Sequence, residues 1–291
     1  MKLVREVFGN RQKTGDLGVE IEVEGVNLPL MDSYWNNEAD GSLRGPESRE
    51  YVLVRPRPLN EVRIALDKLD EAYKLNKTVV HETVRAGVHV HVNCQRLNMV
   101  ELLNYMTLYL ILENVLVKFC GEHREGNLFC LRATDAEYVV NKIVNCCKSM
   151  SFRTFNDDAI RYASMNVKAL ASYGSLEFRA MRGTRDLDAI YNWCKILLDL
   201  RDSAVKYDSP IEIIQDFSVL GPSAFLKKAM GANFKLLPKV ENIEFALHEG
   251  MRIAQDIAYC VDWESWKKKA KVIGGVSFDE NDPALEPPED L

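Results

Sequence analysis

The segment Leu17–Val26 constrains the fold most, because its hydrophobic residues alternate without a break. Positions 17, 19, 21 and 23 are all aliphatic, and small or acidic residues lie between them. Side chains of a β-strand point to its two faces in turn, so the pattern predicts a strand with one buried face. The other face carries Glu20, Glu22 and Glu24. A fold built on this strand must therefore bury one side of a sheet and accommodate carboxylates on the other.

The remaining segments predict an α+β fold. Further strands are expected at 49–54, 78–84, 87–92, 164–169 and 175–181, with the segments 78–84 and 87–92 as a pair and a hairpin-like turn at 172–174. Helices are expected at 59–77, 98–119, 135–150, 186–207, from 221 onward and at 242–262. Asn98 with Glu101 forms a capping box, and Asp186 can cap the helix that follows it. The strands come in clusters rather than in a regular βαβ series, which favours an antiparallel sheet with helices behind it.

The length of 291 residues predicts one domain over 1–278. Within it we expect a helical insertion at about 97–150 and a C-terminal helical region at about 186–266. The segment 279–291 holds six acidic residues, three prolines and no basic residue, which predicts a disordered tail. The tail accounts for the net charge of −6, so the domain itself is neutral and offers no general electrostatic basis for binding nucleic acid or a membrane surface. The oligomeric state stays open, and a homo-oligomer is possible.

The cysteines and the apolar segments predict a cytoplasmic protein. None of the seven cysteines falls in a Cys-x-x-Cys pair, and Cys146 is adjacent to Cys147, which suits neither an ordinary disulfide nor a zinc knuckle. Residues 1–10 contain no apolar core of a signal peptide. The most apolar segment, 105–119, is short and interrupted by Glu113, so we expect a buried helix rather than a membrane span.

Two acidic motifs occur in the first fifty residues. Glu20 and Glu22 lie two apart on the predicted strand, so they share a face with Cα atoms about 7 Å apart. Such a pair can hold hard cations, although a solvated edge strand has the same pattern. The segment 35–43 contains Trp35 and then Asp-Gly-Ser, and Glu50 follows on the next strand. An ordinary surface turn is the alternative explanation for the Asp-Gly pair.

Two later motifs combine carboxylates with basic groups. In the segment 87–92, His89 and His91 share the strand face opposite the valines, which suits metal or phosphate binding. In the segment 175–181, Glu177 and Arg179 share a face, and a carboxylate for metal beside a guanidinium for phosphate suits phosphoryl transfer. Structural histidines and a surface ion pair are the alternatives.

Taken together and in this order, the motifs resemble the amidoligase family, which is related to glutamine synthetase and to glutamate–cysteine ligase. The resemblance spans roughly 18–193. It rests on GxExE, W-x4-DGS, the strand glutamate, GxHVHV and EFR followed by GT, with smaller matches at 124–130 and 161–167. It implies a curved antiparallel sheet of the glutamine synthetase catalytic-domain type. It also implies a ligase that uses ATP and Mg²⁺ or Mn²⁺ to join a carboxylate to an amine, on small-molecule or peptide substrates.

The resemblance also implies a role for each matching residue. One metal that bridges the ATP phosphates would be held by Glu20, His89 and Glu177, and a second one nearer the substrates by Glu22 and Glu50. Arg179 would stabilise the phosphoryl group in transfer. A carboxylate such as Glu22 or Glu50 would accept the proton that the amine loses. Nucleotide phosphate would be contacted by His91, Arg161, Arg179 and Arg124.

Two departures and three alternatives accompany this assignment. Ser175 stands where glutamine synthetase has an arginine, and the stretch from Glu50 to Pro56 is longer than in the family pattern. A phosphotransferase of the guanidino-kinase type would keep the same motifs and stop at a phosphorylated product. A degenerate binding or structural member would bind no ATP, and a metal-dependent hydrolase would act without nucleotide. Charge favours bound cations, because two carboxylates 4 Å apart repel by about 4 kcal/mol at an effective dielectric near 20.

Overall fold

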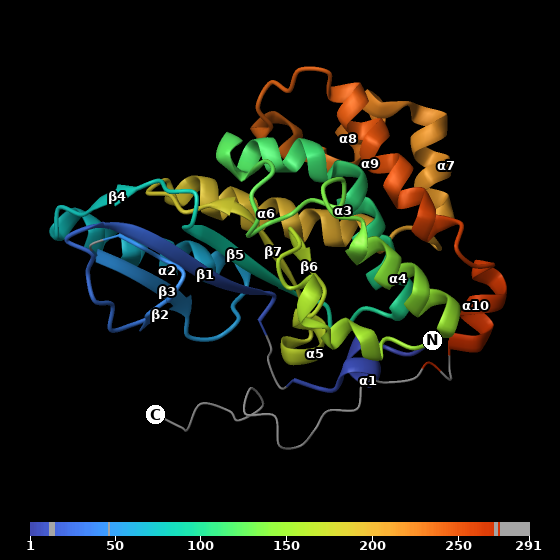
Figure 1. The fold of residues 1–291 in the computed structure, drawn as a ribbon, viewed down its shortest axis with the longest axis horizontal. Coiled ribbons are helices and arrows are strands. Elements are labelled where there is room, and N and C mark those ends of the chain that lie inside the picture. The colour runs from blue at the N-terminus through green and yellow to red at the C-terminus, as the bar shows by residue number, and fades with distance from the viewer. Residues whose placement is uncertain (12–14, 46, 271–272, 274–291) are drawn as a thin grey trace.

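A seven-stranded antiparallel sheet with helices packed against it forms the structure (Figure 1). The computed structural model describes residues 1–11, 15–45, 47–270 and 273, and the predicted acidic tail at 279–291 lies outside them. The strands are β1 (Leu17–Val26), β2 (Trp35–Glu38), β3 (Glu47–Leu53), β4 (Val79–His81), β5 (Gly87–Asn93), β6 (Met165–Asn166) and β7 (Ser175–Arg182). Their order is β2-β3-β1-β5-β7-β6. Strand β4 pairs with residues 24–26 of β1, whereas β5 pairs with residues 17–21 of the same strand. The predicted α+β class is confirmed.

Ten α-helices occur in the described part of the chain. They are α1 (Val4–Phe8), α2 (Leu59–Leu75), α3 (Met99–Cys120), α4 (Tyr138–Ser149), α5 (Ala169–Tyr173), α6 (Leu187–Ala204), α7 (Pro210–Leu220), α8 (Pro222–Met230), α9 (Ile243–Ala258) and α10 (Trp263–Lys269). Short 3₁₀ helices lie at Glu122–Arg124, Arg153–Asn156, Asp158–Ile160 and Gly231–Leu236. The division into a domain with an inserted helical part stays a prediction.

The helices cover one face of the sheet, and the alternation of β1 sets which face. Its aliphatic residues at 17, 19, 21 and 23 are at most 1% exposed. On the same side, Phe178 of β7 packs against Tyr105 and Tyr109 of α3, and the indole of Trp35 donates a hydrogen bond to the carbonyl of Ala65 in α2. Because alternate residues face opposite ways, the glutamates of β1 lie on the face away from these helices.

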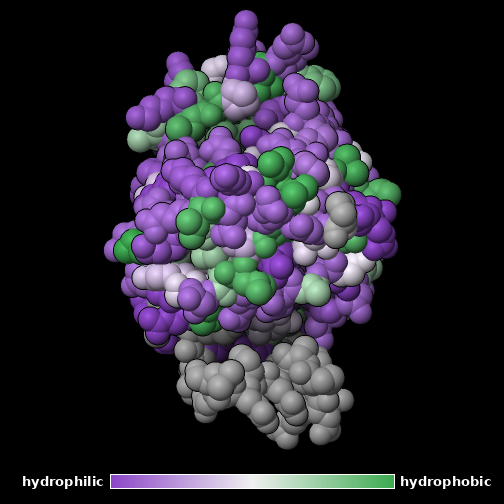
Figure 2. All heavy atoms as spheres, turned by 90° about the vertical axis from the view of Figure 1, so that its left-hand side faces the viewer, coloured by the Kyte–Doolittle hydropathy of each residue, from purple (hydrophilic) through white to green (hydrophobic). Residues whose placement is uncertain are grey.

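Helix α3 explains the long apolar stretch of the sequence. It is the one helix in the described residues that is long and apolar enough to span a membrane, but 94% of its apolar window is buried inside the protein. Its charged residue Glu113 accepts a hydrogen bond from the backbone N–H of Ala133, and burial raises the pKa of Glu113 to about 7. Figure 2 shows one end of the molecule, where the surface is mainly hydrophilic and hydrophobic residues are scattered in small groups.

Caps fix the ends of three helices, and the sequence predicted two of them, at Asn98 and at Asp186. The side chain of Asn98 accepts hydrogen bonds from two N–H groups at the start of α3, and Glu101 completes the capping box. Asp186 caps α6 through the N–H of Ala189. At the other end of a helix, Gly174 closes α5 in a left-handed conformation (φ 70°), which favours glycine. These caps fix where β7 and its neighbouring helices begin.

Three local predictions were wrong. In place of the expected hairpin turn at 172–174, helix α5 ends at Tyr173 and Gly174 is its C-cap; β6 is only two residues long and pairs antiparallel with β7. The segments 78–84 and 87–92 do not pair with each other, because β4 and β5 both pair with β1. The sequence interpretation also omitted four elements, namely α1, β2, α7 and α10.

Candidate functional site

Cross-strand pairing brings the predicted site residues together on the open face of the sheet. Glu20 and Glu22 of β1, His89 and His91 of β5, Glu177 and Arg179 of β7 and Glu50 of β3 come from four adjacent strands. The residues directly opposite one another are Glu20 with His89, His91 with Glu177, and Glu22 with Glu50. The motifs that are far apart in the sequence therefore form one cluster.

The imidazole of His89 lies among three carboxylates at the centre of this cluster. Its Nδ1 atom is 3.2 Å from Glu20 Oε2 and 3.6 Å from Glu177 Oε1, and its Nε2 atom is 3.6 Å from Glu22 Oε1. The residue is only 4% exposed. A single imidazole therefore links carboxylates from two strands that are not neighbours, β1 and β7.

His91 occupies the side of the cluster near α5. Its Nε2 atom lies 3.2 Å from Glu20 Oε1, its Nδ1 atom lies 3.1 Å from the hydroxyl of Ser175, and the ring meets Tyr173 edge-on at 5.3 Å between centroids. Ser175, at the position where glutamine synthetase has an arginine, thus holds the orientation of His91. The aromatic contact could not be inferred from the sequence, where Tyr173 appeared in a turn.

Glu177 and Arg179 form an ion pair inside the cluster. The amide of Asn166 donates to Glu177 Oε2 at 2.6 Å, so both oxygens of this carboxylate are engaged. Arg179 also donates to the carbonyl of Phe129 at 3.3 Å, and its Nη1 atom is 3.4 Å from His89 Nδ1. The guanidinium therefore has a fixed position beside the metal-binding candidates.

Carboxylates with few basic partners form the other half of the site. Glu22, Glu50 and Glu38 lie in register across β1, β3 and β2, and Asp40 hydrogen-bonds to Glu22. The backbone N–H of Gly87 donates to Glu22 Oε2 at 2.9 Å. Like charges directly opposite one another destabilise a sheet, so this row favours a bound cation or a retained proton.

The pKa values differ between the two halves. Burial would raise the pKa of Glu20 and of Glu177, but His91 and His89 near Glu20, and Arg179 with the histidines near Glu177, lower both below the ordinary value. Burial outweighs the effect of His89 and raises the pKa of Glu22. Burial, together with Glu20 and Glu22, raises the pKa of Glu50 to about 8.

Two groups of side chains fit a metal ion. The ligand atoms of Glu20, His91 and Glu177 lie within 4.8 Å of one another, and so do those of Glu20, Glu50 and His89. Carboxylate oxygens with one imidazole suit Mg²⁺ or Mn²⁺. The sequence interpretation assigned His89 to the set with Glu177 and His91 to phosphate, whereas the geometry groups the two histidines the other way round. Which histidine binds metal stays a prediction.

Arg124 and Arg161 are the two further residues predicted to contact phosphate. Arg124 lies beside the cluster, because a Cβ atom placed on Gly87 would be 3.0 Å from Arg124 Nη2 and 3.5 Å from both Glu22 Oε2 and His89 Nε2. Arg124 is 1% exposed, and its guanidinium donates to the backbone carbonyls of Arg179, Ala180 and Ala86. It thereby supports the strand that carries Arg179. Arg161 is exposed and lies over the ring of Tyr162 at 5.1 Å. Their predicted contact with nucleotide stays a prediction.

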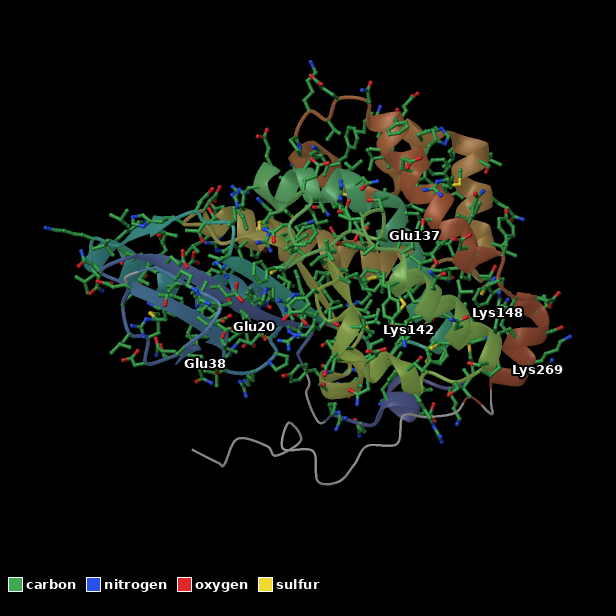
Figure 3. The ribbon with its side chains drawn as sticks, in the orientation of Figure 1. Glu20, Glu38, Glu137, Lys142, Lys148 and Lys269 are labelled. Atoms are coloured by element: carbon green, nitrogen blue, oxygen red, sulfur yellow. The ribbon has the colours of Figure 1, made fainter. Side chains whose placement is uncertain are left out.

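A cavity of about 330 Å³ adjoins the cluster. Glu20, Glu50 and His91 line it, together with residues of β2, β3 and α5. Figure 3 shows Glu20 and Glu38 on the sheet, away from the labelled lysines of α4 and α10. Glu38 and Asp40 fall in the motif 35–43, and Asn166 falls in the match at 161–167, but none of the three had a predicted role. The register of β2 and β6 places Glu38 and Asn166 at the site, and the end of α5 places Tyr173 there.

Comparison with known proteins adds one match. A family model described as "Putative amidoligase enzyme" matches residues 53–200, which run from the end of β3 into α6 and include both histidines, Glu177 and Arg179. The glutamates of β1 and Glu50 precede the matched segment. No curated protein matches the sequence.

Proposed function

Since the chain belongs to the amidoligase family, we propose that it is an ATP-dependent ligase that joins a carboxylate to an amine. The observation that supports this proposal most strongly is the single cluster in which Glu20, His89, Glu177 and Arg179 converge. A guanidinium held beside oxygen-rich metal ligands is what phosphoryl transfer requires.

In the proposed reaction, a substrate carboxylate oxygen attacks the γ-phosphorus of ATP, and the bond from that phosphorus to the β–γ bridging oxygen breaks. The products are an acyl phosphate and ADP. The amine nitrogen then attacks the acyl carbon, phosphate leaves, and the nitrogen loses a proton as the amide forms. Each turnover thus consumes one ATP and releases ADP and phosphate.

The residues of the chain have separate parts in this scheme. Arg179 neutralises negative charge on the phosphoryl oxygens during transfer, and Arg124 and Asn166 hold Arg179 and Glu177 in position. Glu20, Glu50, Glu177 and the histidines would hold Mg²⁺ or Mn²⁺, which supplies charge neutralisation to the phosphates when bound. Glu50 has a raised pKa, which suits a group that exchanges a proton near neutral pH.

The state of the cysteines is consistent with a cytoplasmic location. All seven are free thiols, and six of them are buried, which accords with a reducing compartment. We propose that the enzyme acts there on soluble substrates.

A mass-spectrometric screen tests the function. Purified protein is incubated with ATP, Mg²⁺ and pooled carboxylic acids and amines, and ADP release is followed together with product masses. The proposal expects a product that weighs the sum of one acid and one amine minus water. A stable phosphorylated compound instead would identify a phosphotransferase, and nucleotide-independent cleavage would identify a hydrolase.

A further inference from the structure

The cavity beside the cluster has a charge pattern that defines a ligand. Of its charged or titratable lining residues, Glu20, Glu50 and His91 belong to the two metal-binding groups. A fourth, Asp16, lies 3.0 Å from Arg201 and is neutralised by it. Two charged residues of the lining remain once these are assigned, Glu38 and Arg55.

Glu38 and Arg55 are both available for a ligand. Both are exposed at the cavity, and within the described residues neither side chain forms an ion pair or a hydrogen bond, including with the other. Two opposite charges that line one cavity without meeting can be satisfied by a molecule that carries both charges at separate ends.

The order of the two charges along the cavity gives the ligand a direction. Glu38 lies directly opposite Glu50 and so next to the metal-binding groups. Residues 50–53 are extended in β3, which places the Cα atom of Leu53 about 10 Å from that of Glu50, and Arg55 follows two residues later. The anionic end of the cavity is therefore beside the reaction centre, and the cationic end is farther away.

Apart from the charged residues named above, the cavity lining is uncharged, with apolar residues beside Asn36, Asn93 and Ser175. Val52, Val54 and Pro56 line the cavity, and Tyr173 contributes an aromatic ring near His91. Apolar side chains stabilise an aliphatic segment but provide no partner for a charge in its middle. The expected ligand thus has charged ends and an apolar centre.

We propose that this cavity binds the amine substrate as a zwitterion, with its ammonium group at Glu38 and its carboxylate at Arg55. The inference rests on the proposed function, because it takes the cavity to be the amine site of the ligase. It specifies the substrate class as an amino acid with well-separated charges, such as an ω-amino acid or a short peptide. A polyamine is disfavoured, because its second cation would lie beside Arg55.

Four compounds with one carbon skeleton test the charge pattern. Binding of 6-aminohexanoate, hexylamine, hexanoate and 1,6-diaminohexane to the full chain is measured by calorimetry, with Mn²⁺ and a non-hydrolysable ATP analogue present and again with Mn²⁺ alone. We expect 6-aminohexanoate to bind at least about fivefold more tightly than each of the others, the scale of one exposed ion pair. Equal or tighter binding of the diamine or of hexylamine, or no binding of any compound, would overturn the inference.

Two variants and a control assign each charge. Glu38→Gln should weaken 6-aminohexanoate and hexylamine alike, whereas Arg55→Gln should weaken 6-aminohexanoate to the level of hexylamine and leave hexylamine unchanged. Glu71→Gln is the control, since Glu71 pairs with Lys68 on α2 outside the cavity lining. If both site variants behave like this control, the assignment is wrong.

Nucleotide binding separates the two proposals. If the ATP analogue binds but the four compounds show no preference for the zwitterion, the inference fails and the ligase proposal stands. If the analogue does not bind while the preference for 6-aminohexanoate persists with Mn²⁺ alone, the ligase proposal fails and the charge pattern stands.

Discussion

The two halves of the site differ in how their charges are balanced. On β5 and β7, Glu177 is paired with Arg179 and bound by Asn166, and His89 lies between carboxylates. On β1, β3 and β2, Glu22, Glu50 and Glu38 face one another with few cationic neighbours. The first half is electrostatically complete in the protein alone, and the second half has an excess of negative charge.

The difference indicates which interactions hold the site in place without a ligand and which ones favour the binding of metal or substrate. The ion pairs of the balanced half keep Arg179 oriented without any ligand, which lowers the reorganisation needed for phosphoryl transfer. The acidic half lowers stability until metal or a cationic substrate enters, and that unfavourable energy is recovered as binding affinity.

The largest expected effect comes from the balanced half. Arg179→Lys keeps the charge but loses the planar contact, so turnover should fall by about 10²–10³-fold, the usual scale of one transition-state contact, whereas Mg-ATP binding stays near normal. Steady-state turnover and nucleotide affinity are the two measurements. An ion pair without a catalytic part contributes about 0–1 kcal/mol, and near-normal turnover would reduce Arg179 to that role.

Metal should stabilise both halves, because one metal-binding group includes Glu177 of the balanced half and the other includes Glu50 of the acidic half. Mg²⁺ or Mn²⁺ at about 100 times its dissociation constant stabilises a protein by about 2.7 kcal/mol, so the melting temperature should rise by several degrees. Glu20→Gln should shrink this rise, because Glu20 belongs to both metal-binding groups. Thermal unfolding with and without metal measures both effects, and an unchanged wild-type melting temperature would argue against the cluster as a metal site.

A smaller effect should appear in the pH dependence of the metal-free protein. The pKa of Glu50 is about 8 in the folded state and near 4.5 when unfolded, so the folded state holds the extra proton between these values. The free energy of unfolding should therefore fall as pH rises from about 5 to about 8. Denaturant titrations in a chelating buffer should show a weaker fall in Glu50→Gln, and identical slopes for both proteins would contradict the raised pKa.

The smallest effect is expected far from both halves. Cys146 and Cys147 are buried on α4, and neither lines the cavity. Replacing both with serine should cost stability but change turnover by less than about tenfold, because neither thiol takes part in the chemistry. A larger loss of turnover at unchanged melting temperature would connect α4 to the site.

The balanced half could be largely predicted from the sequence, and the acidic half only in part. Strict alternation in β1, β5 and β7 determines which side chains share a face, so Glu20, His89 and Glu177 could be named together. Strand β2 has a single buried position, Trp35, and four residues are too few for a periodic pattern. Its register with β3, which brings Glu38 opposite Glu50, depends on tertiary contacts.

Two further residues show why local patterns were insufficient. Arg124 matched a family motif, but its burial and its bonds to three backbone carbonyls arise from how β7 packs against the 3₁₀ helix Glu122–Arg124. Tyr173 was expected in a hairpin turn, yet the segment Ala169–Tyr173 contains good helix formers and makes a helical turn. That turn brings its ring to His91.

The proposed function requires that the carboxylates and histidines of this sheet hold the metal ions that accompany ATP. Anomalous X-ray diffraction from crystals grown with Mn²⁺ and a non-hydrolysable ATP analogue tests it most directly. We expect manganese peaks among Glu20, Glu50 and His89 and among Glu20, His91 and Glu177, with analogue phosphates beside Arg179. Bound analogue with manganese elsewhere, or no manganese at this cluster under saturating conditions, would contradict it.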